Sequence, residues 1–136
     1  MSHSDLEKYE ANPVNLLWDD ILFLPVVGMV DSKRAQDIMD VLLEKAEQTA
    51  ARFAILDIRG VAAVDSAVAN HVIKIVKASR MLGCSTILTG VTPAVAQSLV
   101  NVGVDLGDIL CTARVKDALS LAFRELGIEI RPVASD

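Results

Sequence analysis

Apolar residues follow two different periods along this chain, and the change of period marks the elements. The dense apolar run at residues 53–58 is typical of a buried strand, and it ends in a charged turn that contains glycine. After Asp65 and Ser66 the apolar residues recur at helical spacing, at Val68, Val72, Ile75 and Val76. We therefore expect a strand, a short loop and a helix from about Ser66 to Leu82, with the serine in the first turn.

The residues before this unit predict a hairpin and a second helix. The apolar segments 14–18 and 21–24 flank Asp19-Asp20, which indicates two antiparallel strands joined by a tight turn. Pro25 and Gly28 predict that the second strand is kinked or lies at an edge. Asp31-Ser32 supplies an N-cap for a helix whose predicted inward residues are Ala35, Ile38, Met39, Leu42, Leu43 and Ala46.

The second half of the chain continues the alternation of strand and helix. Residues 84–89 predict a buried strand, and Thr92 and Pro93 predict the cap and first position of a helix that stops at Gly103. Residues 108–111 predict a short last strand, and Thr112 is expected to cap the final helix. The inward residues of that helix would be Val115, Ala118, Leu119, Ala122, Phe123 and Leu126, and Gly127 would end it.

This order of elements favours an α/β fold. Right-handed crossovers make the later strands parallel, while the opening hairpin is antiparallel, so we expect a small mixed β-sheet with about four packed α-helices. Residues 128–130 are a candidate for an additional edge strand. Residues 1–13 are predicted to be a polar tail or the end of a linker helix, residues 14–130 the single domain, and residues 131–136 a C-terminal tail.

Composition narrows the core and the function classes. Hydrophobic residues make up 52% of the chain and aromatic residues only 4%, so the core must be aliphatic. Cys84 and Cys111 lie in apolar strand-like runs without ligand spacing, and we expect reduced core thiols and no metal site. The net charge of −5 with dispersed basic residues argues against a nucleic-acid surface. The absence of an apolar run near 18 residues and of a signal peptide predicts a cytoplasmic protein without membrane contact.

The motifs of catalysis are missing from the sequence. No GxSxG, GxGxxG after a strand, P-loop or HExxH motif occurs, so no cofactor is expected. Ser66 and His71 are five positions apart, about 500° of helical rotation, and should face apart. Asp57 is predicted to be a strand-end carboxylate satisfied by a neighbouring loop amide. Ser66 is either a plain first-turn serine or a switch residue, and the exposed stripe Asn70, Lys74, Lys77 and Met81 is either solvated or an interface.

Two segments resemble the STAS domain, the anti-anti-sigma-factor family with the SpoIIAA-like fold. They are residues 57–66 (Asp-Ile-Arg-Gly-Val-Ala-Ala-Val-Asp-Ser) and residues 90–106, which begin Gly-Val-Thr-Pro-Ala-Val-Ala-Gln-Ser. Residues 21–28 add a likeness to the opening of stressosome proteins of the RsbR type. The resemblance covers nearly the whole of residues 14–130 and points to the RsbR and RsbS types.

The resemblance implies a non-enzymatic module whose phosphorylation site, directly after an Asp at the start of the second helix of the domain, falls on Ser66. It implies a kinase partner of the RsbT type, held by the unphosphorylated assembly and released once phosphate accumulates. RsbR/RsbS-type paralogues and a homodimer or larger assembly are the other expected partners. A second phosphorylation position falls on Ser98, with Thr92 also in range. We assign Asp65, Ser66, Asn70, His71 and Lys74 to the expected partner surface.

Two features keep the R-type and S-type assignments both open. The dozen polar residues before Pro13 are too few for the sensory domain of R-type proteins, and Ser66 stands where those proteins usually have Thr. The surroundings of Gly28 and Gly103 favour the R type. Two other functions stay open: a simple anti-anti-sigma factor that binds an anti-sigma kinase, and a small-molecule or nucleotide-binding domain that uses the helix starts at Ser66 and Thr92.

Overall fold

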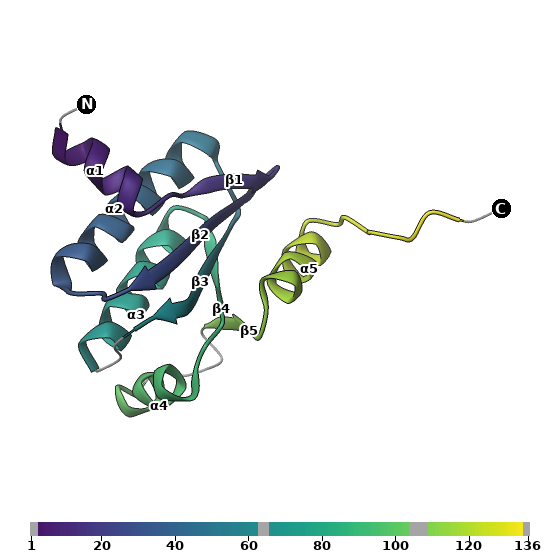
Figure 1. Cartoon of the computed structure of the whole chain (residues 1–136). Helices are drawn as coiled ribbons and strands as arrows, with labels where there is room; N and C mark the ends of the chain where they lie inside the picture. The colour runs from purple at the N-terminus through teal and green to yellow at the C-terminus, as the bar shows by residue number, and fades with distance from the viewer. Residues whose placement is uncertain (1–2, 63–65, 104–108, 135–136) are drawn as a thin grey trace.

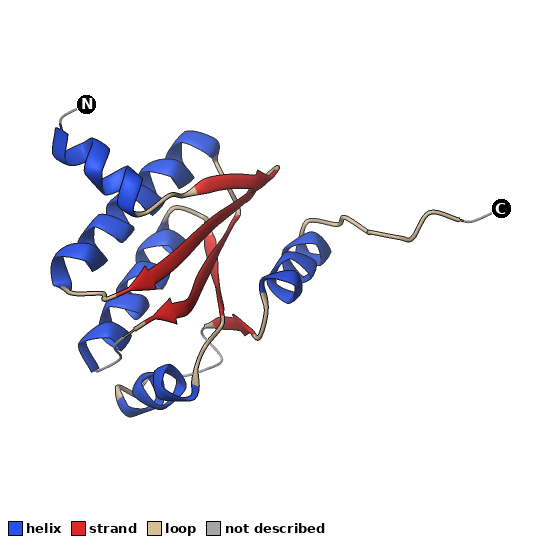
Figure 2. Ribbon diagram, viewed as in Figure 1, coloured by secondary structure: helices blue, strands red, loops and turns tan. Residues whose placement is uncertain are grey.

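A mixed β-sheet forms the centre of the computed structural model, which describes residues 3–62, 66–103 and 109–134 (Figures 1 and 2). Five strands occur in these residues, and their order in the sheet is their order in the chain. β1 pairs antiparallel with β2, and the remaining neighbours are parallel, so the predicted hairpin and mixed sheet are confirmed. The strands are β1 (Asn15–Trp18), β2 (Ile21–Gly28), β3 (Phe53–Val61), β4 (Ser85–Thr89) and β5 (Leu110–Thr112).

Helices cover both faces of the sheet because its strands are apolar on both sides. Alternate residues of β3 divide between two cores: Ala54, Leu56 and Ile58 lie in the larger core, and Phe53 and Ile55 in the smaller. The described helices are α1 (His3–Ala11), α2 (Ser32–Thr49), α3 (Ser66–Met81), α4 (Pro93–Asn101) and α5 (Val115–Glu125). Buried residues of α2, α3 and α4 belong to the larger core, and α5 alone among these described helices supplies buried residues to the smaller one.

The N-terminal segment, predicted to be a tail or the end of a linker helix, contains the described helix α1. Residues 3–11 are helical and pack against α2 through polar groups. The Tyr9 hydroxyl donates a hydrogen bond to Glu44, and this bond, together with burial and the nearby carboxylates, raises the pKa of Tyr9 to about 12. The Lys8 ammonium lies 3.6 Å from the Asp40 carboxylate. This helix also brings the described fold to five helices rather than about four.

The predictions at the end of the chain are wrong in two places. Thr112 does not cap α5: Arg114 holds the N-cap position without a side-chain bond, and the Thr112 hydroxyl donates to the Arg114 carbonyl at 3.0 Å. Residues 128–130 form no strand. Ile130 is instead 70% exposed, and the segment runs away from the body of the domain as extended chain (Figure 1).

Of two predictions in the strands, the one for Cys111 is wrong and the irregularity expected at Pro25 is confirmed. Cys84 is fully buried, and its burial raises the pKa of the thiol to about 11, but Cys111 is exposed because β5 lies at the edge of the sheet. Pro25 lies inside β2, which has β1 on one side and β3 on the other. The register with β3 shifts between Pro25 and Val27, and β1 pairs no further than Phe23, so the missing N–H of proline costs no ladder bond to β1.

Candidate functional site

Two helices begin at the same edge of the sheet, where the parallel strands end. The chain leaves β3 at Val61 and enters α3 at Ser66, and it leaves β4 at Thr89 and enters α4 at Pro93. Val68 and Val95, near the two helix starts, line one common cavity. The first turns of both helices therefore lie at the carboxyl ends of the parallel strands, where the N–H groups of a helix start favour negative charge.

Ser66 is the first residue of α3, as the sequence predicts. Its side chain and the whole of Asp65 lie outside the described residues. The expected residues Val68, Val72, Ile75 and Val76 are buried on α3, together with Ala69 and Ser79. Asn70 and Lys74 of the expected partner surface are exposed on the same helix, and His71 is half-buried.

The start of α4 is fixed by its own cap. The Thr92 side chain accepts a hydrogen bond from the backbone N–H of Val95 at 3.3 Å, and Pro93 follows in the first turn, as predicted. Gly103 has a φ of +78° after the helix. Ser98, the expected second phosphorylation position, is half-buried in the middle of α4.

The turn between β4 and α4 lies in close contact with β3. The Asp57 carboxylate accepts a hydrogen bond from the backbone N–H of Arg59 at 3.1 Å, so its partner amide belongs to β3 itself rather than to a loop. The backbone of Gly90, which has a φ of +70°, passes directly beside these residues of β3. A Cβ atom at that position would meet Arg59 and Asp57 at less than 3.0 Å, which explains the glycine.

A polar cleft of about 300 Å³ lies between α2 and α3. The Ser32 hydroxyl and the Nε2 atom of His71 face each other across it at 3.4 Å. Among the residues that the structure describes, no carboxylate lines this cleft, although the chain as a whole carries a net charge of −5. The lining residues are Ser32, Ala35, Gln36, Met39, His71 and Lys74.

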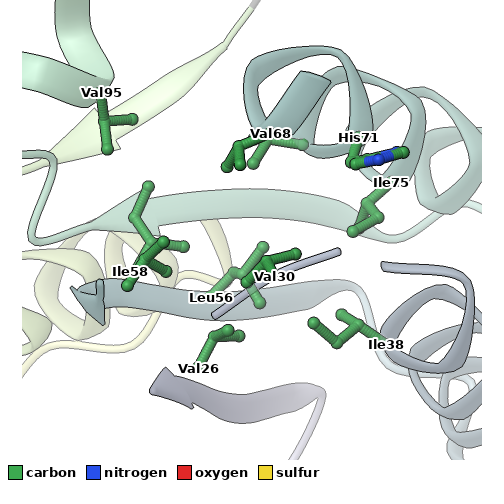
Figure 3. Close-up of a pocket in the computed structure, with 11 residues that line it drawn as sticks. Val26, Val30, Ile38, Leu56, Ile58, Val68, His71, Ile75 and Val95 are labelled. Atoms are coloured by element: carbon green, nitrogen blue, oxygen red, sulfur yellow. The ribbon is translucent and has the colours of Figure 1, made fainter. Parts of the chain in front are cut away.

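An apolar cavity of about 20 Å³ lies under the N-terminal half of α3 (Figure 3). His71 is the one polar residue in its described lining, and the aliphatic side chains come from β2, β3 and three helices or their connections. The space holds roughly one or two water-sized molecules, but it offers them too few hydrogen-bond partners and is expected to be dry. Its lining is Val26, Val30, Ile38, Leu56, Ile58, Val61, Val68, His71, Val72, Ile75 and Val95.

Sequence reasoning missed the contacts between α2 and its neighbours. Arg34 donates to the carbonyl oxygens of Val27 and Met29, at 2.9 Å for Met29, and to the Asn12 side chain at 3.4 Å. It therefore ties the end of α1 to the connection between β2 and α2. No local pattern signals such a bond, because Asn12 and Arg34 are 22 positions apart.

The described residues contain no cluster of three or more His, Cys, Asp or Glu that could hold a metal ion. None of the described helices has the length and hydropathy needed to span a membrane.

Comparison with known proteins identifies the family. The sequence profile of the STAS domain matches residues 15–118. The chain belongs to the STAS domain family. It is 33% identical to the RsbT co-antagonist protein RsbRA of Bacillus subtilis over 81% of this chain and 40% of that protein. It is 32% identical to RsbRD of the same organism over 88% of this chain and 41% of that protein, so this STAS domain spans about 40% of the length of both relatives.

Solved structures agree with the family and with the predicted SpoIIAA-like fold. A variant of RsbS from Moorella thermoacetica has a TM-score of 0.72 and 26% identity over 85% of this STAS domain and 97% of that chain. A chain of the stressosome has a TM-score of 0.66 and 26% identity over 85% and 98%. The unphosphorylated anti-sigma factor antagonist SpoIIAA, at 19% identity and a TM-score of 0.68 over 88% and 100%, supports the fold alone.

Proposed function

We propose that this STAS domain is a non-enzymatic scaffold and antagonist in a cytoplasmic, stressosome-like signalling complex. It binds a serine/threonine switch kinase of the RsbT type together with RsbR/RsbS-type paralogues, and it releases the kinase when Ser66 is phosphorylated. The observation that carries the proposal is the start of α3 at Ser66, at the carboxyl edge of the sheet, in a chain related to RsbT co-antagonists.

The position of Ser66 gives the phosphoryl group two different effects. It adds about −1.5 to −2 charges at the start of a helix, whose unpaired N–H groups tolerate negative charge, so the domain stays folded. A kinase that buries this edge against its own surface would have to desolvate the same charge, which costs binding free energy. The asymmetry between these two effects is what a release switch requires.

The exposed face of α3 supplies the rest of the proposed contact. Asn70 and Lys74 are exposed one and two turns after Ser66, and His71 stands between this face and the α2–α3 cleft. We assign them, with Asp65, to kinase recognition. Ser98 and Thr92 remain proposed as secondary phosphorylation positions, and the Thr92 hydroxyl oxygen is already the acceptor in the cap of α4.

The test is phosphosite mapping after incubation with a purified kinase of the RsbT type, together with capture of that kinase. Ser66→Ala should remove the major phosphorylated site and keep kinase capture, and Ser66→Asp should weaken capture without unfolding the domain. Ser120, exposed on α5 at the opposite face of the sheet, gives the matched control, since Ser120→Ala and Ser120→Asp should change neither. Labelling of another major site in Ser66→Ala, or undiminished capture by Ser66→Asp, would contradict the proposal.

A further inference from the structure

The open edge of the sheet at β1 is unusually apolar for an exposed strand. All four residues of β1 are exposed, and in the described sheet the strand has β2 as its one neighbour. Leu16, Leu17 and Trp18 are 47%, 44% and 52% exposed. Edge strands are ordinarily protected by charge, proline or a covering element, because their free N–H and C=O groups accept another strand.

Residues 128–131 have the pattern of a strand but no partner strand in the described sheet, and they start beside β1. The Trp18 and Phe123 rings are in edge-to-face contact at 5.3 Å, and the backbone N–H of Ile128 donates to the Phe123 carbonyl at 2.8 Å. From Ile128 the chain alternates apolar and charged residues through Arg131, and it extends away from the domain (Figures 1 and 2). Pro132, which lacks an N–H, limits the pairing segment to residues 128–131, the same length as β1.

We propose that β1 accepts residues 128–131 of a second copy of this chain, in a reciprocal exchange of strands. Each copy supplies one open edge and one unpaired strand, so one two-fold dimer satisfies both. The exchange covers Leu16, Leu17 and Trp18 mainly with Ile130, which is 70% exposed, because Ile128 already packs against the smaller core of its own copy. A flat contact between two β1 edges would cover only three half-exposed side chains per copy, far short of the roughly 800 Å² per partner of a standard interface.

The geometry of the chain after α5 favours the second copy over the same copy. Gly127 has a φ of +75°, and the bond from Ile128 to Phe123 then sets the direction away from the body. A return to the same β1 needs a second reversal within residues 128–131. This segment contains no glycine, asparagine or aspartate, and its two β-branched isoleucines disfavour a positive φ.

Charge selects the direction of the exchanged strand. Asp19 and Asp20 follow β1 directly, and residues 128–131 carry one anion, Glu129, and one cation, Arg131. If the strand runs parallel to β1, Arg131 comes beside Trp18 and the acidic turn, whereas an antiparallel strand brings Glu129 closer to that turn. The parallel direction is therefore the expected one.

Trp18, the single tryptophan of the chain, reports the exchange directly. Its emission should shift to shorter wavelength as protein concentration rises, in step with dimer formation in sedimentation velocity, since pairing buries the indole. Ile130→Lys should weaken the dimer about tenfold or more, because it places a charge on the covering face. Val133→Lys, at a residue 94% exposed and beyond Pro132, should leave the dimer unchanged. Arg131→Glu should weaken it, most at low salt.

Three results would overturn the proposal. A buried Trp18 at every concentration would mean that the segment pairs with its own β1. A dimer that persists in Ile130→Lys with Trp18 exposed would mean association through another surface. A monomer at all concentrations would remove the interface altogether. None of these results bears on kinase capture by Ser66, and loss of kinase capture would leave the strand exchange untouched.

Discussion

The contact of Gly90 with β3 predicts an unusually large cost for a small substitution. In Gly90→Ala the new Cβ would lie 2.5 Å from the Arg59 Cβ atom and 2.9 Å from both the Arg59 backbone nitrogen and the nearer Asp57 carboxylate oxygen. The φ of +70° alone costs alanine about 1–2 kcal/mol. Overpacking against backbone that cannot easily move adds about 1–3 kcal/mol, so we expect a loss of about 2–5 kcal/mol in the free energy of unfolding.

Gly83→Ala is the matched control for this prediction. Gly83 has a φ of +80°, but no described atom lies within 4 Å of the place that a Cβ would take. Alanine there would pay the cost of the left-handed backbone conformation but would overlap no neighbouring atom. The substitution should cost about 1–2 kcal/mol. Urea denaturation followed by far-UV circular dichroism gives both free energies. Equal losses in the two variants would refute the steric reasoning and leave only the backbone conformation as the reason for Gly90.

Four further predictions concern other residues. Thr92→Ala should lose about 1 kcal/mol in urea denaturation, because it removes the acceptor that caps α4, and an unchanged stability would contradict this. Arg34→Ala should speed hydrogen exchange at the end of β2 and in its connection to α2, where Arg34 binds the carbonyls of Val27 and Met29, and leave β4 unchanged. A thiol reagent should label exposed Cys111 in the folded protein and reach Cys84 only on unfolding. Burial raises the pKa of Cys84 to about 11 in the folded protein, against 9.0 for a free thiol, so unfolding at a pH between these two values releases a proton. Stability should therefore fall as pH rises from 9 to 11, and Cys84→Ala should remove that part of the fall.

The sequence predicts the layout of this fold well wherever an element carries its own signals. The starts of α2 and α4 follow from Asp31 and from Thr92-Pro93, and both caps make the expected bonds. The start of α3 at Ser66 follows from a change of period alone. These signals lie within a few residues of the feature that they mark, so a local pattern contains them.

The features that sequence reasoning missed or left open depend on residues far away in the chain. The sequence could not decide between a tail and a helix for the N-terminal segment, because α1 has no apolar stripe and is held by Glu44 and Asp40, more than 30 positions away. The pairing of Ser32 with His71 across the α2–α3 cleft is of the same kind. Residues 128–130 show the opposite error, since their pattern predicts a strand but cannot tell whether a neighbouring edge is within reach.

The two proposed surfaces lie at opposite ends of the parallel strands, and this separation leads to a last prediction. Ser66 follows the carboxyl end of β3, whereas Trp18 pairs with Ile21 and so lies at the amino edge of the parallel strands. The nine residues of β3 span about 30 Å, several times the roughly 8–10 Å over which salt screens charge. Charge at Ser66 should therefore leave strand exchange unchanged, and Ser66→Asp should show the concentration dependence of Trp18 emission seen in the unmodified chain. If the concentration at which Trp18 emission changes shifted tenfold or more in Ser66→Asp, the sheet would couple the start of α3 to β1, because direct electrostatics cannot act over such a distance.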